Sequence, residues 1–174
     1  MVLLSEPFLL EPLRIEDASS LNHLMISNGK RFQKYLPNTL AQNISEDASK
    51  SYIQDKIKES ENKTEFTFAI KDKDTKQIAG LVILKNITHK QAEFAYCLGA
   101  KYSGNGWVTK SITAATNFAF NELQLNTLQI ITHHTNTQSI NVAKRCGFNW
   151  VKTLVGEFDS EEGPLDMELY QKNA

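Results

Sequence analysis

The chain has 174 residues, of which 41% are hydrophobic and 22% charged, a balance typical of one soluble globular domain with a sizeable core. Its formal net charge is −1 with no block of like charge, so nothing favours binding to nucleic acid or to an anionic membrane. No apolar run approaches the ~18 residues of a membrane-spanning helix, and the opening MVLLSEP lacks the features of a signal peptide, so we expect a cytoplasmic protein.

The N-terminal half of the sequence predicts one strand followed by helices. Pro7 and Pro12 favour an edge position for the strand, because proline cannot donate a hydrogen bond to a neighbouring strand. Asn28-Gly29 and Pro37 each end a helix, and Ser45 is a suitable N-cap for the next one. The predicted elements are a strand over 8–14, a helix over 15–28, a short helix over 32–36 and a helix over 46–60.

The second half predicts an antiparallel meander, then alternating helices and strands. Its predicted elements are strands over 65–71, 77–85 and 92–98, a helix over 108–123, a strand over 127–132, a helix over 137–146, and a closing hairpin of strands over 150–158 and 165–170 around Glu161-Glu162-Gly163-Pro164. This order indicates an α+β fold with a mixed, mostly antiparallel central sheet of about seven strands flanked by helices. We expect a single domain over residues 1–174.

The stretch Ser103-Gly104-Asn105-Gly106-Trp107-Val108 joins a predicted strand to the start of the long helix. Glycine lets a backbone take positive φ and approach a ligand closely. The first N–H groups of a helix have no intrahelical partner and carry partial positive charge. A strand, a Gly-x-Gly turn and an uncapped helix start therefore predict a phosphate site. The alternative is a plain turn whose glycines only relieve strain.

This turn resembles the Gln/Arg-x-x-Gly-x-Gly/Ala motif that holds the pyrophosphate of acetyl-CoA in the GNAT superfamily of N-acetyltransferases. Gly104 and Gly106 match the motif, whereas Ser103 stands in place of Gln/Arg and Val108 in place of a small residue. The resemblance covers nearly the whole order of elements. It implies that the coenzyme is bound by Ser103, Gly104, Asn105, Gly106, Trp107, Val108 and Thr109, and that Tyr96, Cys97 and Leu98 lie along its pantetheine arm.

A second segment, HTNTQSINVAKRCGF over residues 134–148, resembles the Asn-x-x-Ser, helix, Gly-Phe segment of the same superfamily. The full string is most similar to the branch that acetylates ribosomal-protein N-termini at serine or alanine. The resemblance implies that Asn136 holds the pantetheine and that Ser139 protonates or hydrogen-bonds the leaving thiolate. The alternative reading of both residues is helix capping, for which their side chains are well suited.

Transfer of an acetyl group to an amine needs a proton acceptor. An α-amine has a pKa near ~7.8 and a lysine near ~10.4, so the nucleophile must lose a proton at neutral pH. A carboxylate can serve as general base, directly or through water. The two candidates are Glu93, on the strand that leads into the glycine turn, and Glu65, at the start of the second predicted strand, over 65–71. Either one is equally well explained as an exposed carboxylate.

The remaining reactive residues give weaker signals. Cys97 and Cys146 lie in apolar sequence and suggest neither a disulfide nor a metal site, and we expect Cys97 to be a core or pocket-lining thiol. The histidines, including His133 and His134, have no metal-ligand spacing, so we expect no metal. The aromatic residues that either line an acceptor groove or belong to the core are Phe32, Tyr35 and Trp107.

Together, the residues and the resemblance predict an enzyme that transfers an acetyl group directly from acetyl-CoA to a primary amine. The resemblance favours a protein N-terminal amine, of the ribosomal-protein type, as acceptor. Three alternatives stay open: a small amine such as a polyamine, an amino acid or an aminoglycoside; a non-catalytic CoA-binding module; and a structural protein without a ligand. Enzymes of this kind often form homodimers, so the resemblance also implies a homodimer.

Overall fold

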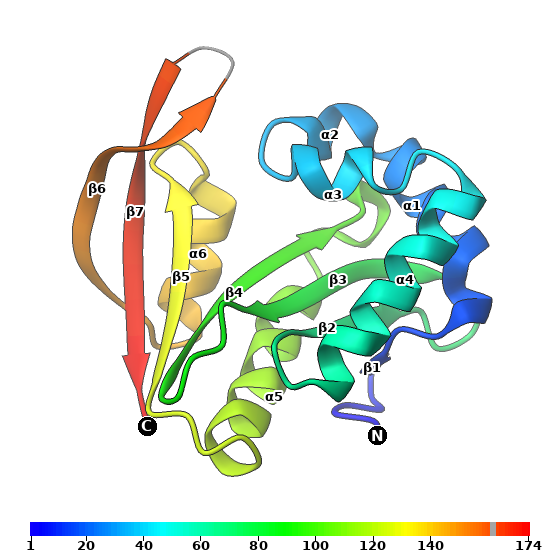
Figure 1. The fold of residues 1–174 in the computed structure, drawn as a ribbon, viewed down its shortest axis with the longest axis horizontal. Helices are drawn as coiled ribbons and strands as arrows, with labels where there is room; N and C mark the ends of the chain where they lie inside the picture. The colour runs from blue at the N-terminus through cyan, green and yellow to red at the C-terminus, as the bar shows by residue number, and fades with distance from the viewer. Residues whose placement is uncertain (161–162) are drawn as a thin grey trace.

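The computed structural model describes residues 1–160 and 163–174, which share one seven-stranded sheet of order β1-β2-β3-β4-β5-β7-β6 (Figure 1). All neighbouring strands are antiparallel except β4 and β5, which are parallel. The predicted α+β fold with a mixed, mostly antiparallel sheet is confirmed. The strands are β1 (Leu9–Pro12), β2 (Phe66–Lys71), β3 (Ile78–Lys85), β4 (Gln91–Leu98), β5 (Thr127–His133), β6 (Asn149–Ser160) and β7 (Gly163–Asn173).

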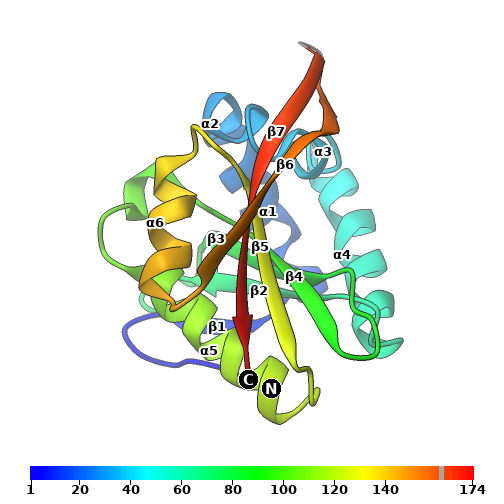
Figure 2. The ribbon, with the colours of Figure 1, turned by 90° about the vertical axis from the view of Figure 1, so that its left-hand side faces the viewer.

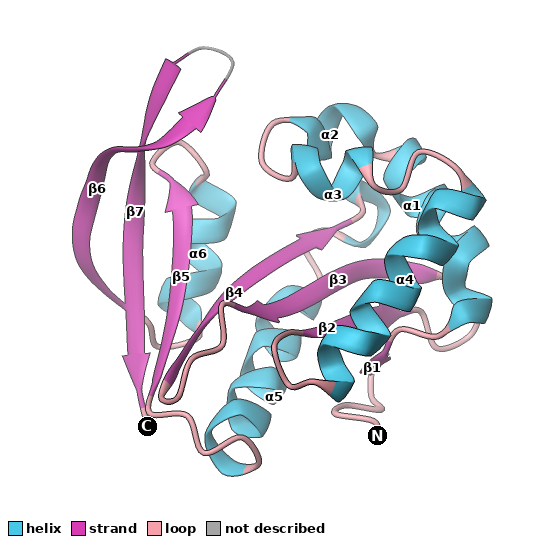
Figure 3. Ribbon diagram, in the orientation of Figure 1, coloured by secondary structure: helices cyan, strands magenta, loops and turns pink. Residues whose placement is uncertain are grey.

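Helices cover both faces of the sheet (Figure 3). They are α1 (Ala18–Ser27), α2 (Gly29–Gln33), α3 (Pro37–Ala41), α4 (Glu46–Glu61), α5 (Trp107–Asn121) and α6 (Thr137–Arg145), with short 3-10 turns at Ile15–Asp17 and Ala100–Tyr102. Helices α5 and α6 pack on one face around Phe94, Ile112 and Ala143, whereas α1 and α4 pack on the other around Leu21 and Ile53. The alternation of side chains along each strand divides the core into these two layers.

Several local predictions are confirmed. Strand β1 lies at one edge of the sheet, as the prolines indicated. The hydroxyl of Ser45 accepts a hydrogen bond from the Ala48 N–H at 3.1 Å and caps α4. Gly147 takes a φ of +78° directly after α6 and ends that helix.

The segment between α1 and α4 differs from its prediction. One short helix was expected to end before Pro37, but α2 begins at Gly29 and a further helix, α3, begins at Pro37 itself. Proline is tolerated at the first helical position, where its missing N–H has no intrahelical partner, so it opens α3. Asn28 separates α1 from α2 and connects them to the 3-10 turn after β4, since its amide nitrogen donates to the Leu24 carbonyl and its amide oxygen accepts from the Ala100 N–H, both at 2.9 Å.

The closing hairpin is longer than predicted, and it extends beyond the helices at one end of the molecule (Figure 2). Two register shifts in β6, at 150–152 and 154–158, bend it against β7. Glu161 and Glu162 of the predicted turn lie outside the described residues.

The feature of the fold that positions the site is the divergence of β4 and β5. Their parallel pairing runs only from Gln91 with Thr127 to Phe94 with Ile130, although both strands continue beyond it. Figure 1 shows the two strands separating toward the end that carries α2. The backbone of β4 from residue 95 onward therefore has no strand partner on the β5 side, and an opening forms between the strands.

Candidate functional site

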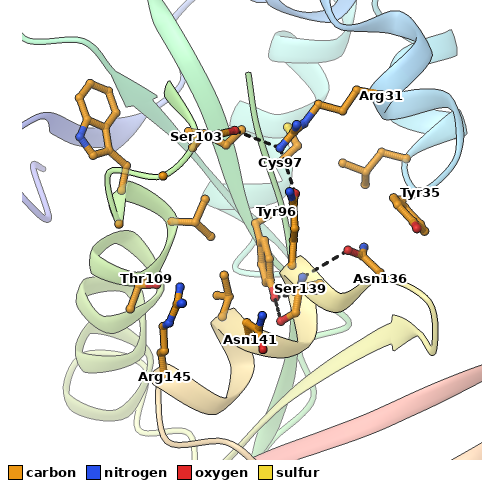
Figure 4. Close-up of a pocket in the computed structure, with 18 of the residues that line it drawn as sticks. Arg31, Tyr35, Tyr96, Cys97, Ser103, Thr109, Asn136, Ser139, Asn141 and Arg145 are labelled. Atoms are coloured by element: carbon orange, nitrogen blue, oxygen red, sulfur yellow. Dashed lines mark hydrogen bonds between the residues drawn. The ribbon is translucent and has the colours of Figure 1, made fainter. Parts of the chain in front are cut away.

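A pocket of about 420 Å³ lies at this opening, between α2, the end of β4, the start of α5 and α6 (Figure 4). It brings together the two segments that the sequence singled out, although they are far apart in the chain. The predicted coenzyme residues that line it are Tyr96, Cys97, Leu98, Ser103, Gly104, Gly106, Trp107, Val108, Thr109, Asn136 and Ser139. Asn105 is the predicted residue that does not, since its side chain turns back to donate to the Tyr102 carbonyl at 3.4 Å.

The glycine turn has the conformation that a phosphate site needs. Gly104 and Gly106 have φ of +87° and +70°, in the left-handed region that side chains rarely adopt. The Lys110 N–H bonds to the Gly106 carbonyl, so the N–H groups of the first turn before it have no intrahelical acceptor. A Cβ at Gly106 would meet no atom within 4 Å, which leaves open space above the positive end of α5.

The opposite wall is the start of α6. The Asn136 side-chain oxygen accepts from the Ser139 N–H at 3.2 Å, so the helix-capping role is realised while Asn136 also lines the pocket. The Tyr96 hydroxyl lies 2.7 Å from the Ser139 hydroxyl and 3.1 Å from the Ser139 carbonyl, and its single proton can be donated to either oxygen. Burial raises the pKa of Tyr96, which keeps its hydroxyl protonated and able to donate.

Cys97 lines the pocket as a buried, protonated thiol. It is 7% exposed, and burial raises its pKa to about 12. The thiolate, which is the nucleophilic form, is therefore scarce at neutral pH. Both Cys97 and Cys146 are free, as predicted.

Neither predicted general base lines the pocket. The Glu93 carboxylate lies 3.2 Å from the Lys85 ammonium and accepts from the Asn86 amide at 2.9 Å. The Glu65 carboxylate lies 2.7 Å from Lys56 of α4 and accepts from the Thr67 hydroxyl at 3.2 Å. Strand alternation puts Glu93 on the α1–α4 face of β4, together with Cys97. The structure thus places both carboxylates in ion pairs away from Ser139, and their role stays a prediction.

Sequence reasoning missed two arginines that line the pocket, Arg31 and Arg145. Arg145 lies on the same face of α6 as Gln138 and Asn141, at a spacing that a helical projection of the Asn-x-x-Ser segment would have revealed. Arg31 comes from α2, and no local motif marks it. Among the described residues, those that line the pocket include two arginines and no carboxylate, so this lining favours an anionic ligand.

The α2 side of the pocket is aromatic. Phe32 is 3% exposed and belongs to the core, while its neighbour Tyr35 is 38% exposed, and both line the pocket. The Tyr35 hydroxyl lies 3.5 Å from the Thr135 hydroxyl, which in turn lies 2.6 Å from His133 Nδ1. The Thr135 hydrogen bond lowers the pKa of Tyr35, and burial lowers the pKa of His133. Thr135 and His133 are not themselves lining residues, so Tyr35 connects the pocket wall to two polar side chains beside the pocket.

Within the described ranges 1–160 and 163–174, no group of three or more His, Cys, Asp or Glu side chains could hold a metal ion. In the same ranges, none of the helices is both long and apolar enough to cross a lipid bilayer.

Comparisons with known proteins identify the family. The model of the acetyltransferase (GNAT) domain matches residues 8–149. Spermidine N(1)-acetyltransferase of Escherichia coli (strain K12) is 33% identical over 82 residues, which are 46% of this chain and 44% of that enzyme. This match thus spans less than half of the curated relative.

Three solved structures are similar over nearly their whole length. A ribosomal-protein-S5-alanine acetyltransferase from Vibrio fischeri has a TM-score of 0.92 at 18% identity, covering 99% of this chain and 96% of that one. A ribosomal L7/L12 α-N-protein acetyltransferase in complex with coenzyme A has a TM-score of 0.91 at 18% identity, covering 99% and 98%. A microcin C7 self-immunity acetyltransferase in complex with acetyl-CoA and AMP has a TM-score of 0.90 at 26% identity, covering 98% and 94%.

The chain belongs to the acetyltransferase (GNAT) domain family. The predicted family and fold are thereby confirmed. Coenzyme A or acetyl-CoA is bound in two of these similar structures, which agrees with the predicted coenzyme.

Proposed function

We propose that this protein transfers an acetyl group from acetyl-CoA directly to a primary amine. The observation that carries the proposal is the meeting of the glycine turn and the Asn136–Ser139 segment in one pocket of positive character. The residues present suit the coenzyme: open helix N–H groups and arginines for its phosphates, and an unpaired length of β4 backbone for its amides.

Acetyl-CoA supplies a thioester, whose carbonyl carbon the amine attacks. A C–N bond forms, the C–S bond breaks, and the sulfur leaves as a thiolate. In this pocket the N–H groups at the start of α5 hold the pyrophosphate, and the backbone around Tyr96 and Cys97 orients the pantetheine. The Ser139 hydroxyl, held by Tyr96 at 2.7 Å, donates to the leaving sulfur.

For the amine proton we favour Glu93 over Glu65. Glu93 is on the strand that carries Tyr96 and Cys97, one residue before the end of the β4–β5 pairing. Glu65 lies beside β2, two strands away, and faces Lys56 of α4. Four residues of strand separate Glu93 from Cys97, about 13 Å, so the proton reaches the carboxylate through water.

The acceptor we propose is the N-terminal amine of a protein. The resemblance and the ribosomal-protein acetyltransferases among the similar folds support it. In the described part of the chain, no carboxylate lines the pocket, which disfavours a polycation at the pocket itself. A polyamine is the second candidate, because the partial sequence match is to a spermidine acetyltransferase. A cytoplasmic location and a homodimer stay predictions.

Calorimetry with acetyl-CoA tests the coenzyme site, comparing the parent protein with Gly106→Asp and Gly106→Asn. Asn and Asp have the same size and both tolerate left-handed backbone, so the pair isolates the effect of a negative charge where phosphate is expected. We expect tight binding by the parent, weaker binding by the Asn variant and none by the Asp variant. A folded parent that does not bind acetyl-CoA would overturn the proposal.

Turnover with Ser- or Ala-initiated peptides, compared with spermidine, then tests the acceptor. A higher kcat/KM for the peptides supports a protein N-terminus, and the reverse result favours the polyamine. Binding without turnover of any amine would leave a non-catalytic CoA-binding module.

A further inference from the structure

Arg31 links α2 to both predicted coenzyme segments. Its Nη2 donates to the Ser103 hydroxyl at 3.1 Å and to the side-chain oxygen of Gln138 at 3.1 Å. Ser103 is the first residue of the glycine turn, and Gln138 lies between Asn136 and Ser139. Figure 4 shows the Arg31 side chain reaching from α2 into the pocket toward Ser103.

The partners of this guanidinium are both neutral. A guanidinium carries five N–H donors in a fork that matches carboxylate or phosphate oxygens. In the part of the chain that the structure describes, no carboxylate lies within ion-pair distance of Arg31. Its charge therefore faces the pocket without a counter-ion.

The position of this charge is informative, because Ser103 occupies the place of Gln or Arg in the motif that the turn resembles. The Ser103 hydroxyl holds the Arg31 guanidinium beside the start of α5, whose N–H groups already carry partial positive charge. Two positive groups side by side are unfavourable alone and become favourable when an anion lies between them.

We propose that Arg31 supplies, from α2, the side-chain charge that position 103 lacks, and that it binds a phosphate oxygen of the coenzyme. The inference rests on the proposed function. On binding, the guanidinium exchanges its neutral partners for a phosphate oxygen and holds α2 over the coenzyme. Because Tyr35 is four residues further along the same segment, coenzyme binding also fixes the acceptor side of the pocket.

The test is calorimetry with acetyl-CoA and, separately, with S-acetylpantetheine, which lacks the pyrophosphate. Arg31→Met should weaken acetyl-CoA binding by about 10- to 100-fold, the loss of one charge-assisted hydrogen bond. The same variant should bind S-acetylpantetheine like the parent. Lys30→Met, which removes the same charge from an exposed neighbouring position, should bind acetyl-CoA within about twofold of the parent.

Moving the arginine from position 31 to position 103 distinguishes a role of Arg31 in phosphate binding from a purely structural role in the fold. Adding Ser103→Arg to the Arg31→Met variant should restore most of the affinity, because the guanidinium then comes from the position that the motif uses. Acetyl-CoA binding by Arg31→Met equal to that of the parent would overturn the inference alone. An equal loss for acetyl-CoA and S-acetylpantetheine would also overturn it, whereas a parent that fails to bind acetyl-CoA would overturn the proposed function itself.

Discussion

The hydroxyl of Tyr96 lies 2.7 Å from the hydroxyl of Ser139, a residue 43 positions further along the chain. Tyr96 is on β4 and points to the α5–α6 face, where it meets the first turn of α6. The contact is made where β4 and β5 no longer pair, so the strands' divergence lets α6 approach β4. It connects the end of β4, along which the pantetheine arm is predicted to lie, to the Asn136–Ser139 segment.

From this contact we predict that Tyr96 affects kcat indirectly, by orienting the Ser139 hydroxyl. Ser139→Ala should lower kcat about 10²-fold by removing the donor to the leaving sulfur. Tyr96→Phe should lower kcat about tenfold, since Ser139 loses the bond that orients it, while KM for acetyl-CoA changes little. The measurement is steady-state kinetics at saturating acceptor, with Tyr102→Phe as a matched control.

The double variant Tyr96→Phe/Ser139→Ala should be no slower than Ser139→Ala, because a positioning residue has no effect once the group it positions is gone. Multiplicative losses in kcat would mean instead that Tyr96 and Ser139 act independently.

The two glutamates make a second prediction. Glu93→Gln should lower kcat about 10²-fold or more, because the amide cannot accept the amine proton. Glu65→Gln should leave kcat close to that of the parent, since its carboxylate pairs with Lys56 of α4 at 2.7 Å. Glu59→Gln, which removes the other partner of Lys56 at 2.8 Å, controls for loss of charge around that lysine. The measurement is kcat from about pH 6 to about pH 9 with a peptide acceptor.

A lower kcat for Glu65→Gln together with an unchanged kcat for Glu93→Gln would assign the general base to Glu65 instead of Glu93. Normal turnover by both variants would show that neither carboxylate is the base. The next residue to replace would then be His133, which lies beside Tyr35 and whose pKa is lowered by burial.

The parts of the site that the sequence predicted are those built from local chemistry. Gly104 and Gly106 signalled positive φ, and Asn136 with Ser139 signalled a helix start, because each property depends on neighbouring residues only. The apolar run of β3 likewise marked a central strand, because a strand covered on both faces is apolar on both.

The parts that escaped prediction depend on contacts distant in sequence. Arg31 contacts Ser103, which is 72 positions further along the chain, and no sequence pattern within α2 indicates that contact. The additional helix α3 escaped because a proline can either end a helix or open one, and contacts with α2 and, through Leu40, with the core decide between those roles. The pairing of Glu93 with Lys85 was invisible for a similar reason, since it depends on the register between β3 and β4.

Because both cysteine thiols are buried, we expect them to be alkylated slowly and to form no acyl-enzyme intermediate. With a pKa of about 12 for Cys97, only about 10⁻⁴ of that thiol is ionised at pH 8. Its reaction with iodoacetamide should be on the order of 10³-fold slower than that of a free cysteine, and the rate should rise about tenfold per pH unit. Burial also raises the pKa of Cys146, so both thiols should react much faster after unfolding in urea than in the folded protein.

Intact-mass measurement after incubation with acetyl-CoA and no acceptor completes this test. We expect unmodified protein, as direct transfer requires. A stable acetyl group on Cys97 would contradict direct transfer and indicate a two-step mechanism.

The last prediction concerns the buried ion cluster that anchors β1 to β2. The Lys71 ammonium lies 2.7 Å from Asp17 and 2.9 Å from Glu11, and the three side chains are only 6–9% exposed. Lys71→Met would leave the buried carboxylate of Asp17 without a counter-ion and Glu11 with only the more exposed Arg14 at 3.1 Å, which costs about 3–5 kcal/mol of unfolding free energy. Urea denaturation measures this loss, and Lys50→Met, which breaks an exposed pair with Glu46, should change the midpoint far less.

The double variant Asp17→Asn/Lys71→Met should lose less stability than Lys71→Met alone, because it removes the buried carboxylate that has no other ion-pair partner among the described residues. The cluster lies at the β1 edge of the sheet, far in strand order from β4 and the pocket, so folded Lys71→Met should bind acetyl-CoA as the parent does. A loss below about 1 kcal/mol would mean that water reaches Glu11 and Asp17 once the lysine is gone. Weaker acetyl-CoA binding at full folding would mean instead that this edge is coupled to the opening between β4 and β5.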